Sequence, residues 1–184
     1  EDTSFESLAL THSRTWQFGT TRYDEPTSAV TDASGNIYVT VNSRPSSGSG
    51  IEDAYLYKYD SSGTFLQKVS PLSCCDFNYH LMSGVTKRAN GPVYVTGLFN
   101  RDKDYMYIAK TIADGSLRLI EKFSEAVDSD GHPTLLRPYA IIASSPFEVL
   151  LLFSRSSYPY ETRRVYLMQY SVTYQRVWWE TYMG

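Results

Sequence analysis

Few residues in this 184-residue sequence have the types and spacing for nucleophilic chemistry. Cys75 and His80 are close in sequence, but five residues across a strand and a loop (80 − 75) do not orient a thiol toward an imidazole. The sequence contains neither a Gly-x-Ser-x-Gly elbow nor a glycine-rich phosphate loop. We therefore expect no catalytic residue and no cofactor, and a hydrolase is only a distant alternative.

Cys74 and Cys75 are adjacent, and three interpretations stay open for them: a disulfide between the two neighbours, bonds to other chains, or two free thiols. A bond between neighbours closes almost no loop, so it would add little stability. Metal binding is the weakest interpretation, because His12, His80 and His132 show no spacing that would complete a tetrahedral site. We favour free thiols or the Cys74–Cys75 disulfide and expect no metal.

The carboxylates occur mainly where turns and loops are expected. The segment Asp128-Ser129-Asp130-Gly131 resembles the beginning of a calcium loop but lacks the later ligands, so a polar turn is the better interpretation. Asp32 and Asp60 stand at turn starts, where a carboxylate accepts hydrogen bonds from backbone N–H groups. A glycosidase pair would require two carboxylates roughly 5 to 9 Å apart, which is a property of the fold and not of the sequence. The remaining carboxylates are therefore assigned only to loops: Asp24, Glu25 and Asp53.

Aromatic side chains are the stronger candidates for binding. Tyr158 and Tyr160 flank a proline in a long loop, and Trp178 lies near the end of the chain, so these rings could stack on a ligand such as a sugar or seal an interface. Packing between repeats is the alternative, which we favour for Trp16 and Trp179. We assign Tyr158, Tyr160 and Trp178 as the candidate ligand-binding residues.

Composition limits the classes of partner. The formal charge is −3, with 17 basic and 20 acidic residues interspersed, which gives no basic face for nucleic acid and no polybasic segment for a membrane surface. The longest apolar run, 149–153, is far below the roughly 18 residues of a spanning helix. The chain begins at Glu1 without a leader, so we expect a processed protein or a piece of a longer one.

A repeat organises the chain. The segment Gly35-Asn36-Ile37-Tyr38-Val39-Thr40 returns as Gly91-Pro92-Val93-Tyr94-Val95-Thr96, and 147–152 is a diverged third copy. Tyr38, Tyr94 and Leu150 are 56 residues apart (94 − 38 and 150 − 94), which indicates a repeat architecture. Alternating patterns and turn residues predict four strands in each unit, at 28–31, 36–41, 54–59 and 64–69, then 81–86, 93–98, 105–110 and 116–120, then 139–143, 148–153, 165–170 and 175–180.

The motif of the first unit reads Ala29-Val30-x-Asp32-x-x-Gly35-Asn36-Ile37-Tyr38-Val39-Thr40, then Asp53-Ala54, then Lys58-Tyr59-Asp60-x-x-Gly63, after a tryptophan and an acidic loop. Residues 16–69 are thereby similar to the β-propeller repeat of secreted bacterial proteins. The resemblance implies radially arranged, four-stranded antiparallel blades and an extracellular or cell-surface location. It implies no shared catalytic residues.

The number of repeats departs from that family. We expect one all-β domain over 1–184, a propeller-type array with repeats at about 16–70, 71–123 and 124–184 and a period of about 52–56 residues. Propellers have about four to eight blades, so three repeats are incomplete as a closed ring. We expect a structural protein that self-associates or joins further repeats, in a filament or surface layer. The alternative is a ligand-binding module for a glycan or a protein.

Overall fold

The computed structural model describes residues 23–44, 53–70, 79–88, 91–100, 104–124, 134–145, 147–157, 163–173 and 176–182. These residues form twelve strands: β1 (Tyr23–Thr31), β2 (Ile37–Arg44), β3 (Asp53–Tyr59), β4 (Phe65–Val69), β5 (Tyr79–Lys87), β6 (Val93–Asn100), β7 (Asp104–Thr111), β8 (Leu117–Ser124), β9 (Thr134–Ser145), β10 (Glu148–Ser157), β11 (Arg163–Ser171) and β12 (Arg176–Tyr182). Each strand overlaps a predicted strand, and most extend further, but β2, β4, β8 and β12 begin one residue later than predicted.

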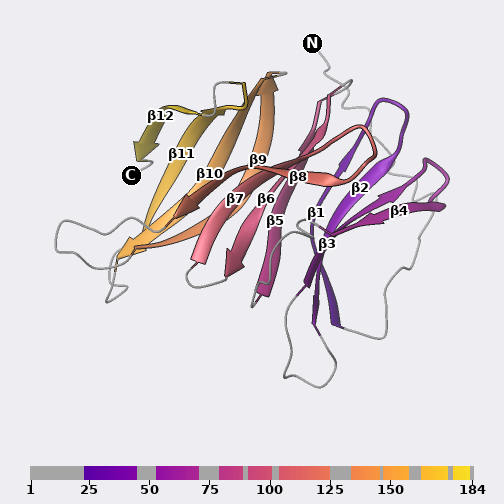
Figure 1. The fold of residues 1–184 in the computed structure, drawn as a ribbon, viewed down its shortest axis with the longest axis horizontal. Helices are drawn as coiled ribbons and strands as arrows, with labels where there is room; N and C mark the ends of the chain where they lie inside the picture. The colour runs from indigo at the N-terminus through magenta and orange to yellow at the C-terminus, as the bar shows by residue number, and fades with distance from the viewer. Residues whose placement is uncertain are drawn as a thin grey trace, which may run out of the picture.

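The strands make three four-stranded antiparallel sheets, each in sequential order: β1 to β4, β5 to β8, and β9 to β12. We refer to them as the first, second and third sheet. The sheets lie side by side in chain order, with the first and the third at opposite ends of the molecule (Figure 1). The fold class predicted from the sequence, an open propeller-type array of three four-stranded repeats, is therefore confirmed.

Local turn chemistry explains the tight hairpins. Gly35, Gly63 and Gly115 adopt φ values of 79°, 84° and 83°, a backbone conformation that glycine tolerates without a steric penalty. In the first hairpin, the Asp32 carboxylate accepts hydrogen bonds from the backbone N–H groups of Ser34 and Asn36 at 3.0 and 2.9 Å. Asp60 caps its turn in the same way. The interpretation of Asp32 and Asp60 as turn caps is confirmed.

A β-bulge recurs at one position of every repeat. In the pairing of the first two strands of each sheet, one extra residue is inserted: Thr27, Ser83 and Tyr139. These three residues are 56 positions apart (83 − 27 and 139 − 83), the same period as the sequence repeat. Because a bulge bends and twists its strand, the shared position gives the first strand of each sheet a similar shape.

Two predicted loop assignments are wrong. Asp24 and Glu25 lie within β1, and Asp53 begins β3. Their polar side chains and the nearby Pro26 suggested a loop, but antiparallel pairing with β2 extends through these positions. Asp24 and Asp53 both pair with Ser43, so the two carboxylates lie on the same face of the first sheet.

The core consists of apolar layers between successive sheets. Tyr38 and Leu56 of the first sheet pack with Val85 and Val95 of the second. A further layer joins the second sheet to the third and includes Tyr94, Met106, Ile108, Val149, Leu151, Phe153 and Met168. The first strand of the second sheet, β5, contacts β1, β2 and β3 of the first sheet. The first strand of the third sheet, β9, contacts β5, β6 and β7 of the second sheet.

Polar contacts join the second and third sheets. The Tyr170 hydroxyl donates to Glu121 Oε2 at 3.0 Å, and the backbone N–H of Ala143 donates to the Thr86 hydroxyl at 3.2 Å. Burial and the bond to Glu121 raise the pKa of Tyr170 well above its usual value. The contact therefore requires the protonated phenol.

Candidate functional site

The third sheet has one face that points away from the second sheet. Val149, Leu151 and Phe153 of β10 pack against the second sheet, so the alternating residues Leu150 and Leu152 point the opposite way. Cross-strand partners share that face. We call this surface the third-sheet outer face, and its residues include Leu135, Arg137, Tyr139, Ile142, Leu150, Leu152, Ser154, Ser156, Arg163, Val165 and Leu167.

The third-sheet outer face is more exposed than the matching faces of the other sheets. Ile142 is 58% exposed, and Leu150 is half-buried. At the repeat position of Leu150, Tyr38 and Tyr94 are 7% and 2% exposed, because each packs in an apolar layer shared with the sheet that follows. In the first and second sheets, these positions are covered by the sheet that follows. In the third sheet, they are still accessible to solvent.

The first sheet has an outer face at the other end of the array. Val39 and Val41 of β2 cluster with Tyr59 on the side away from the second sheet. We call this surface the first-sheet outer face, and its residues include Asp24, Pro26, Ala29, Ile37, Val39, Val41, Ser43, Asp53, Tyr55, Tyr57, Tyr59 and Phe65. Tyr55, Tyr57 and Tyr59 share this face because they alternate along β3.

Aromatic rings line the first-sheet outer face. The rings of Tyr57 and Tyr59 stack with centroids 6.4 Å apart, and Phe65 meets Tyr59 edge-on at 5.9 Å. The Lys68 ammonium lies 3.5 Å from the centre of the Tyr55 ring, close enough for a cation–π contact. This row gives the face a large apolar area with polar hydroxyl tips, a composition typical of protein interfaces.

Several residues of β1 are also more exposed than the corresponding residues of β5 and β9. Ala29 is exposed, whereas the residues at the same repeat position, Val85 and Ile141, are buried against the preceding sheet. Val39 and Val41 are themselves buried. The accessible part of the first-sheet outer face therefore lies along β1 and around Phe65, which is 55% exposed.

Arginines gather at one end of the third-sheet outer face. The Arg163 guanidinium donates from Nε to the Ser154 hydroxyl at 3.1 Å and lies 5.3 Å from the centre of the Tyr139 ring. Arg137 and Arg163 line an open cleft of about 390 Å³ together with Leu135 and Ser156. The hydrogen bond and the ring contact hold the Arg163 charge in a defined position at the surface.

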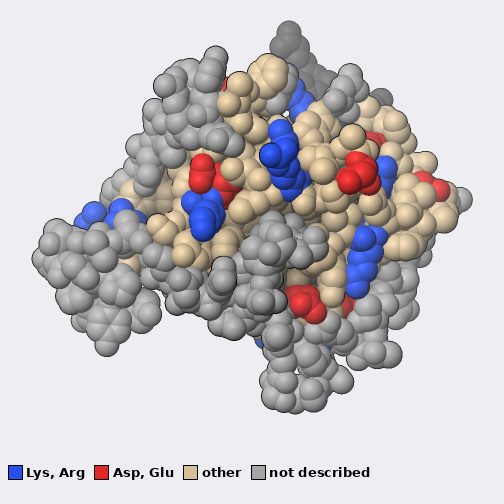
Figure 2. All heavy atoms as spheres, in the orientation of Figure 1, with Lys and Arg blue, Asp and Glu red and all other residues tan. Residues whose placement is uncertain are grey.

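Aspartates gather at the matching end of the first-sheet outer face. The Ser43 hydroxyl donates to Asp24 Oδ1 at 2.7 Å, and the Tyr55 hydroxyl donates to Asp53 Oδ2 at 3.3 Å. These two carboxylates flank the end of β2, just as the arginines of the third sheet flank the end of β10. In Figure 2, the charged side chains on the visible face are scattered and form no continuous patch of one sign.

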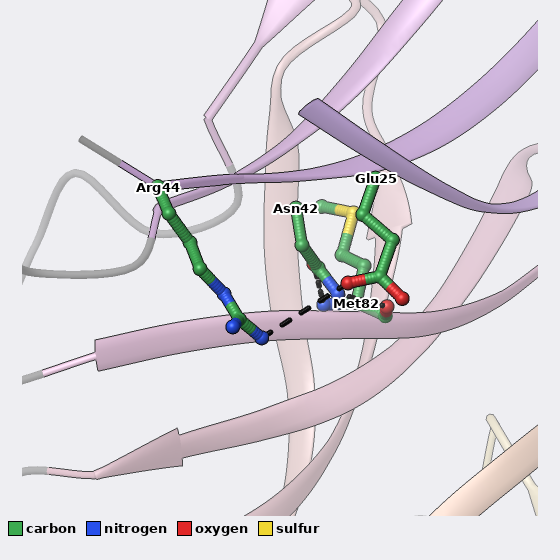
Figure 3. Close-up of polar contacts among 4 residues, drawn as sticks. All are labelled: Glu25, Asn42, Arg44 and Met82. Atoms are coloured by element: carbon green, nitrogen blue, oxygen red, sulfur yellow. Dashed lines mark hydrogen bonds and ion pairs between the residues drawn. The ribbon is translucent and has the colours of Figure 1, made fainter. Parts of the chain in front are cut away.

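Asn42 joins the first sheet to the second by a two-point contact. Its side-chain amide donates to the Met82 carbonyl oxygen at 3.2 Å, and its Oδ1 accepts from the Met82 backbone N–H at 2.8 Å (Figure 3). Met82 stands next to the bulged residue Ser83. The amide thus satisfies two buried backbone groups beside a bulge. Nearby, Arg44 and Glu25 form an exposed ion pair at 4.0 Å, which contributes little stability.

His80 is buried between the first two sheets. It is 7% exposed, and its ring contacts those of Phe99 and Tyr107 at 5.8 and 5.5 Å. Burial lowers the pKa of His80 to about 4, although the negative charge of Asp53 opposes the shift. His80 is therefore neutral at pH 7, and its aromatic surroundings are those of a core residue.

A smaller cleft of about 190 Å³ lies between the first and second sheets, lined by residues that include Tyr38, Lys58, Gln67 and Gly115. The Tyr38 hydroxyl donates to Asp32 Oδ2 at 3.1 Å. Burial and the Asp32 charge raise the pKa of Tyr38 to about 12. The Tyr38 phenol is therefore protonated at neutral pH.

Two of the three predicted ligand-binding residues, Tyr158 and Tyr160, lie outside the described part of the chain. The candidate disulfide residues Cys74 and Cys75 also lie outside it. Trp178 is placed by its backbone only, as an extra residue in β12 where the pairing with β11 shifts. Within the described residues, no cluster of three or more His, Cys, Asp or Glu could hold a metal ion, and no helix is long and apolar enough to span a membrane.

Comparison with protein-family models found no match to the chain. A search of curated proteins likewise found no matching sequence. The resemblance to a propeller repeat therefore stays an expectation that rests on the motifs of the sequence.

Proposed function

We propose that this chain is a non-catalytic structural protein of the cell surface or the extracellular space, and that its propeller-like sheets associate with further copies of the chain or further repeats. The observation that carries the proposal is the third-sheet outer face, where Ile142 is 58% exposed. Earlier in the chain, the same face receives the next sheet. A filament or surface layer is the expected product.

Contacts between neighbouring repeats stabilise a repeat array. A repeat buries its apolar faces against its neighbours, and an end repeat without a polar outer surface exposes them to water. Ile142, Leu150 and Leu152 are apolar residues on such an end surface. Fully burying an exposed large aliphatic side chain contributes about 1.5–3 kcal/mol. Covering the exposed Ile142 and the half-buried Leu150 and Leu152 would therefore favour association.

The association is tested by sedimentation velocity over a range of protein concentrations. Ile142→Glu places a charge in the third-sheet outer face and should leave the chain monomeric at concentrations where the wild type assembles. The matched control is Ile112→Glu, since Ile112 is 40% exposed in the turn between β7 and β8. This control should assemble like the wild type. Equal assembly of both variants, or a wild type that stays monomeric throughout, would contradict the proposal.

The alternative proposal is a ligand-binding module for a glycan or a protein. It is supported by the cleft of Arg137, Ser156 and Arg163, because β10 ends and β11 begins beside this cleft and residues 158–162 connect the two strands. Tyr158 and Tyr160 belong to that connection. A glycan-array signal that Tyr158→Ala and Tyr160→Ala both abolish would support this alternative, and an empty array would argue against a glycan.

A further inference from the structure

We infer that the occupant of the third-sheet outer face is the accessible β1 side of the first-sheet outer face of a second copy, so that copies join head to tail with Asp24 of one copy opposite Arg163 of the next. The inference rests on the proposed association and names its partner surface and polarity. Such a heterologous contact uses two different surfaces and therefore continues into a ring or a filament.

Internal packing shows how successive sheets align. The first strand of each following sheet lies across the preceding one: β5 contacts β1, β2 and β3, and β9 contacts β5, β6 and β7. If the contact between copies repeats this arrangement, β1 of one copy lies across β9, β10 and β11 of the other. The accessible stretch of β1, which includes Ala29, would then cover the exposed Ile142 and the neighbouring leucines.

The repeat positions place the charges near one another. The residue of the second sheet that corresponds to Asp24 is His80 (80 − 24 = 56). The negative charge of Asp53, at the start of β3, acts on the His80 imidazole. In the third sheet, the matching strand start is that of β11, where Arg163 and Arg164 lie. A docked β1 therefore brings Asp24 to the arginine end of the third-sheet outer face.

The two outer faces carry opposite charges at matching ends. Asp24 and Asp53 lie on the first-sheet outer face, and Arg137 and Arg163 lie on the third-sheet outer face. At the corresponding positions of the second sheet, the chain has the uncharged side chains of Tyr105 and Leu81, the neutral His80, and Asp104 at the position of Arg163. Because complementary charges select partner and orientation, this pattern favours joining the third sheet to the first and disfavours joining like faces.

Charge reversal at each end, alone and in mixture, tests the inference. One variant carries Arg137→Glu and Arg163→Glu, and the other carries Asp24→Lys and Asp53→Lys. Each variant alone should associate at least about tenfold more weakly than the wild type, because like charges then face each other. An equimolar mixture should recover association, since each reversed end then meets a complementary one. Arg118→Glu on the outermost strand of the second sheet is the control and should behave like the wild type.

The outcomes distinguish the head-to-tail contact from the proposed association of copies. Recovery in the mixture supports the head-to-tail contact, and it also shows that both variants are folded, because an unfolded variant would not restore assembly. A wild type that assembles while the reversed variants assemble equally well would overturn the head-to-tail contact and leave the proposed association standing. Weak association that the mixture does not restore would also overturn it. A wild type that stays monomeric would overturn both.

Discussion

The buried His80 predicts a specific loss of stability in mild acid. His80 lies against Phe99 and Tyr107, and burial lowers its pKa from the ordinary value of 6.5 to about 4. Between about pH 4 and pH 6.5, His80 is therefore mostly protonated in the unfolded chain and mostly neutral in the folded chain. Since the unfolded state gains protons in this window, the free energy of unfolding falls as pH drops from about 6.5 toward 4.

The magnitude follows from the size of the pKa shift. A lowering from 6.5 to about 4 corresponds to a loss of about 3 kcal/mol once pH is below both values, at 1.36 kcal/mol per pKa unit. At pH 5 most of that loss, about 2 kcal/mol, should already be present. The contribution is fully retained above the unfolded pKa.

The assay is urea unfolding at several pH values from 7.5 to 4.5, compared between the wild type and His80→Phe. Phenylalanine keeps an aromatic ring beside Phe99 and Tyr107 but does not titrate, and His12 and His132 are common to both proteins. The difference in unfolding free energy between the two proteins should change by about 2 kcal/mol from pH 7 to pH 5, in favour of the variant at low pH. Parallel stability curves would refute the reasoning.

Three further substitutions test the packing. Gly97→Ala should lower the unfolding free energy by about 3 kcal/mol or more, because a Cβ there would overlap the Leu81 carbonyl oxygen; a loss below about 1 kcal/mol by chemical denaturation would contradict this. Asn42→Leu should cost about 2–4 kcal/mol, since it leaves the Met82 N–H and carbonyl groups unsatisfied, and an unchanged melting temperature would argue against the contact. Gly115→Ala should cost about 1–2 kcal/mol, because Gly115 has a φ of 83° and lies against Gln67; Gly91→Ala, with only ordinary contacts, is its control and should be nearly neutral.

The sequence predicted features that depend on local chemistry. The turns at Asp32–Gly35 and Asp60–Gly63 were predictable, because an aspartate that caps backbone N–H groups and a glycine with positive φ act within a few residues. The strand predicted at 54–59 likewise follows from local alternation, which places Tyr55, Tyr57 and Tyr59 on one face. The period of 56 residues then fixed the number of sheets in the described chain.

Features that join distant residues were not predictable in this way. Asn42 and Met82 are 40 residues apart, and an asparagine at the end of a strand does not indicate a partner in another sheet. The bulged residues Thr27, Ser83 and Tyr139 share a position but no side-chain chemistry, so composition gave no signal for them. The period of 56 residues aligns the three bulged residues with one another. It also shows that charged residues, Asp24 and Arg137, occur in the first strand of the first and third sheets.

The central claim is that the outer faces of the end sheets associate, and the most direct test is the molar mass of the wild-type chain measured by light scattering across protein concentration. The account predicts a mass that rises above the 20.9 kDa of one chain toward a discrete oligomer or a fibre as concentration increases. A mass that stays at one chain over the whole range would contradict it.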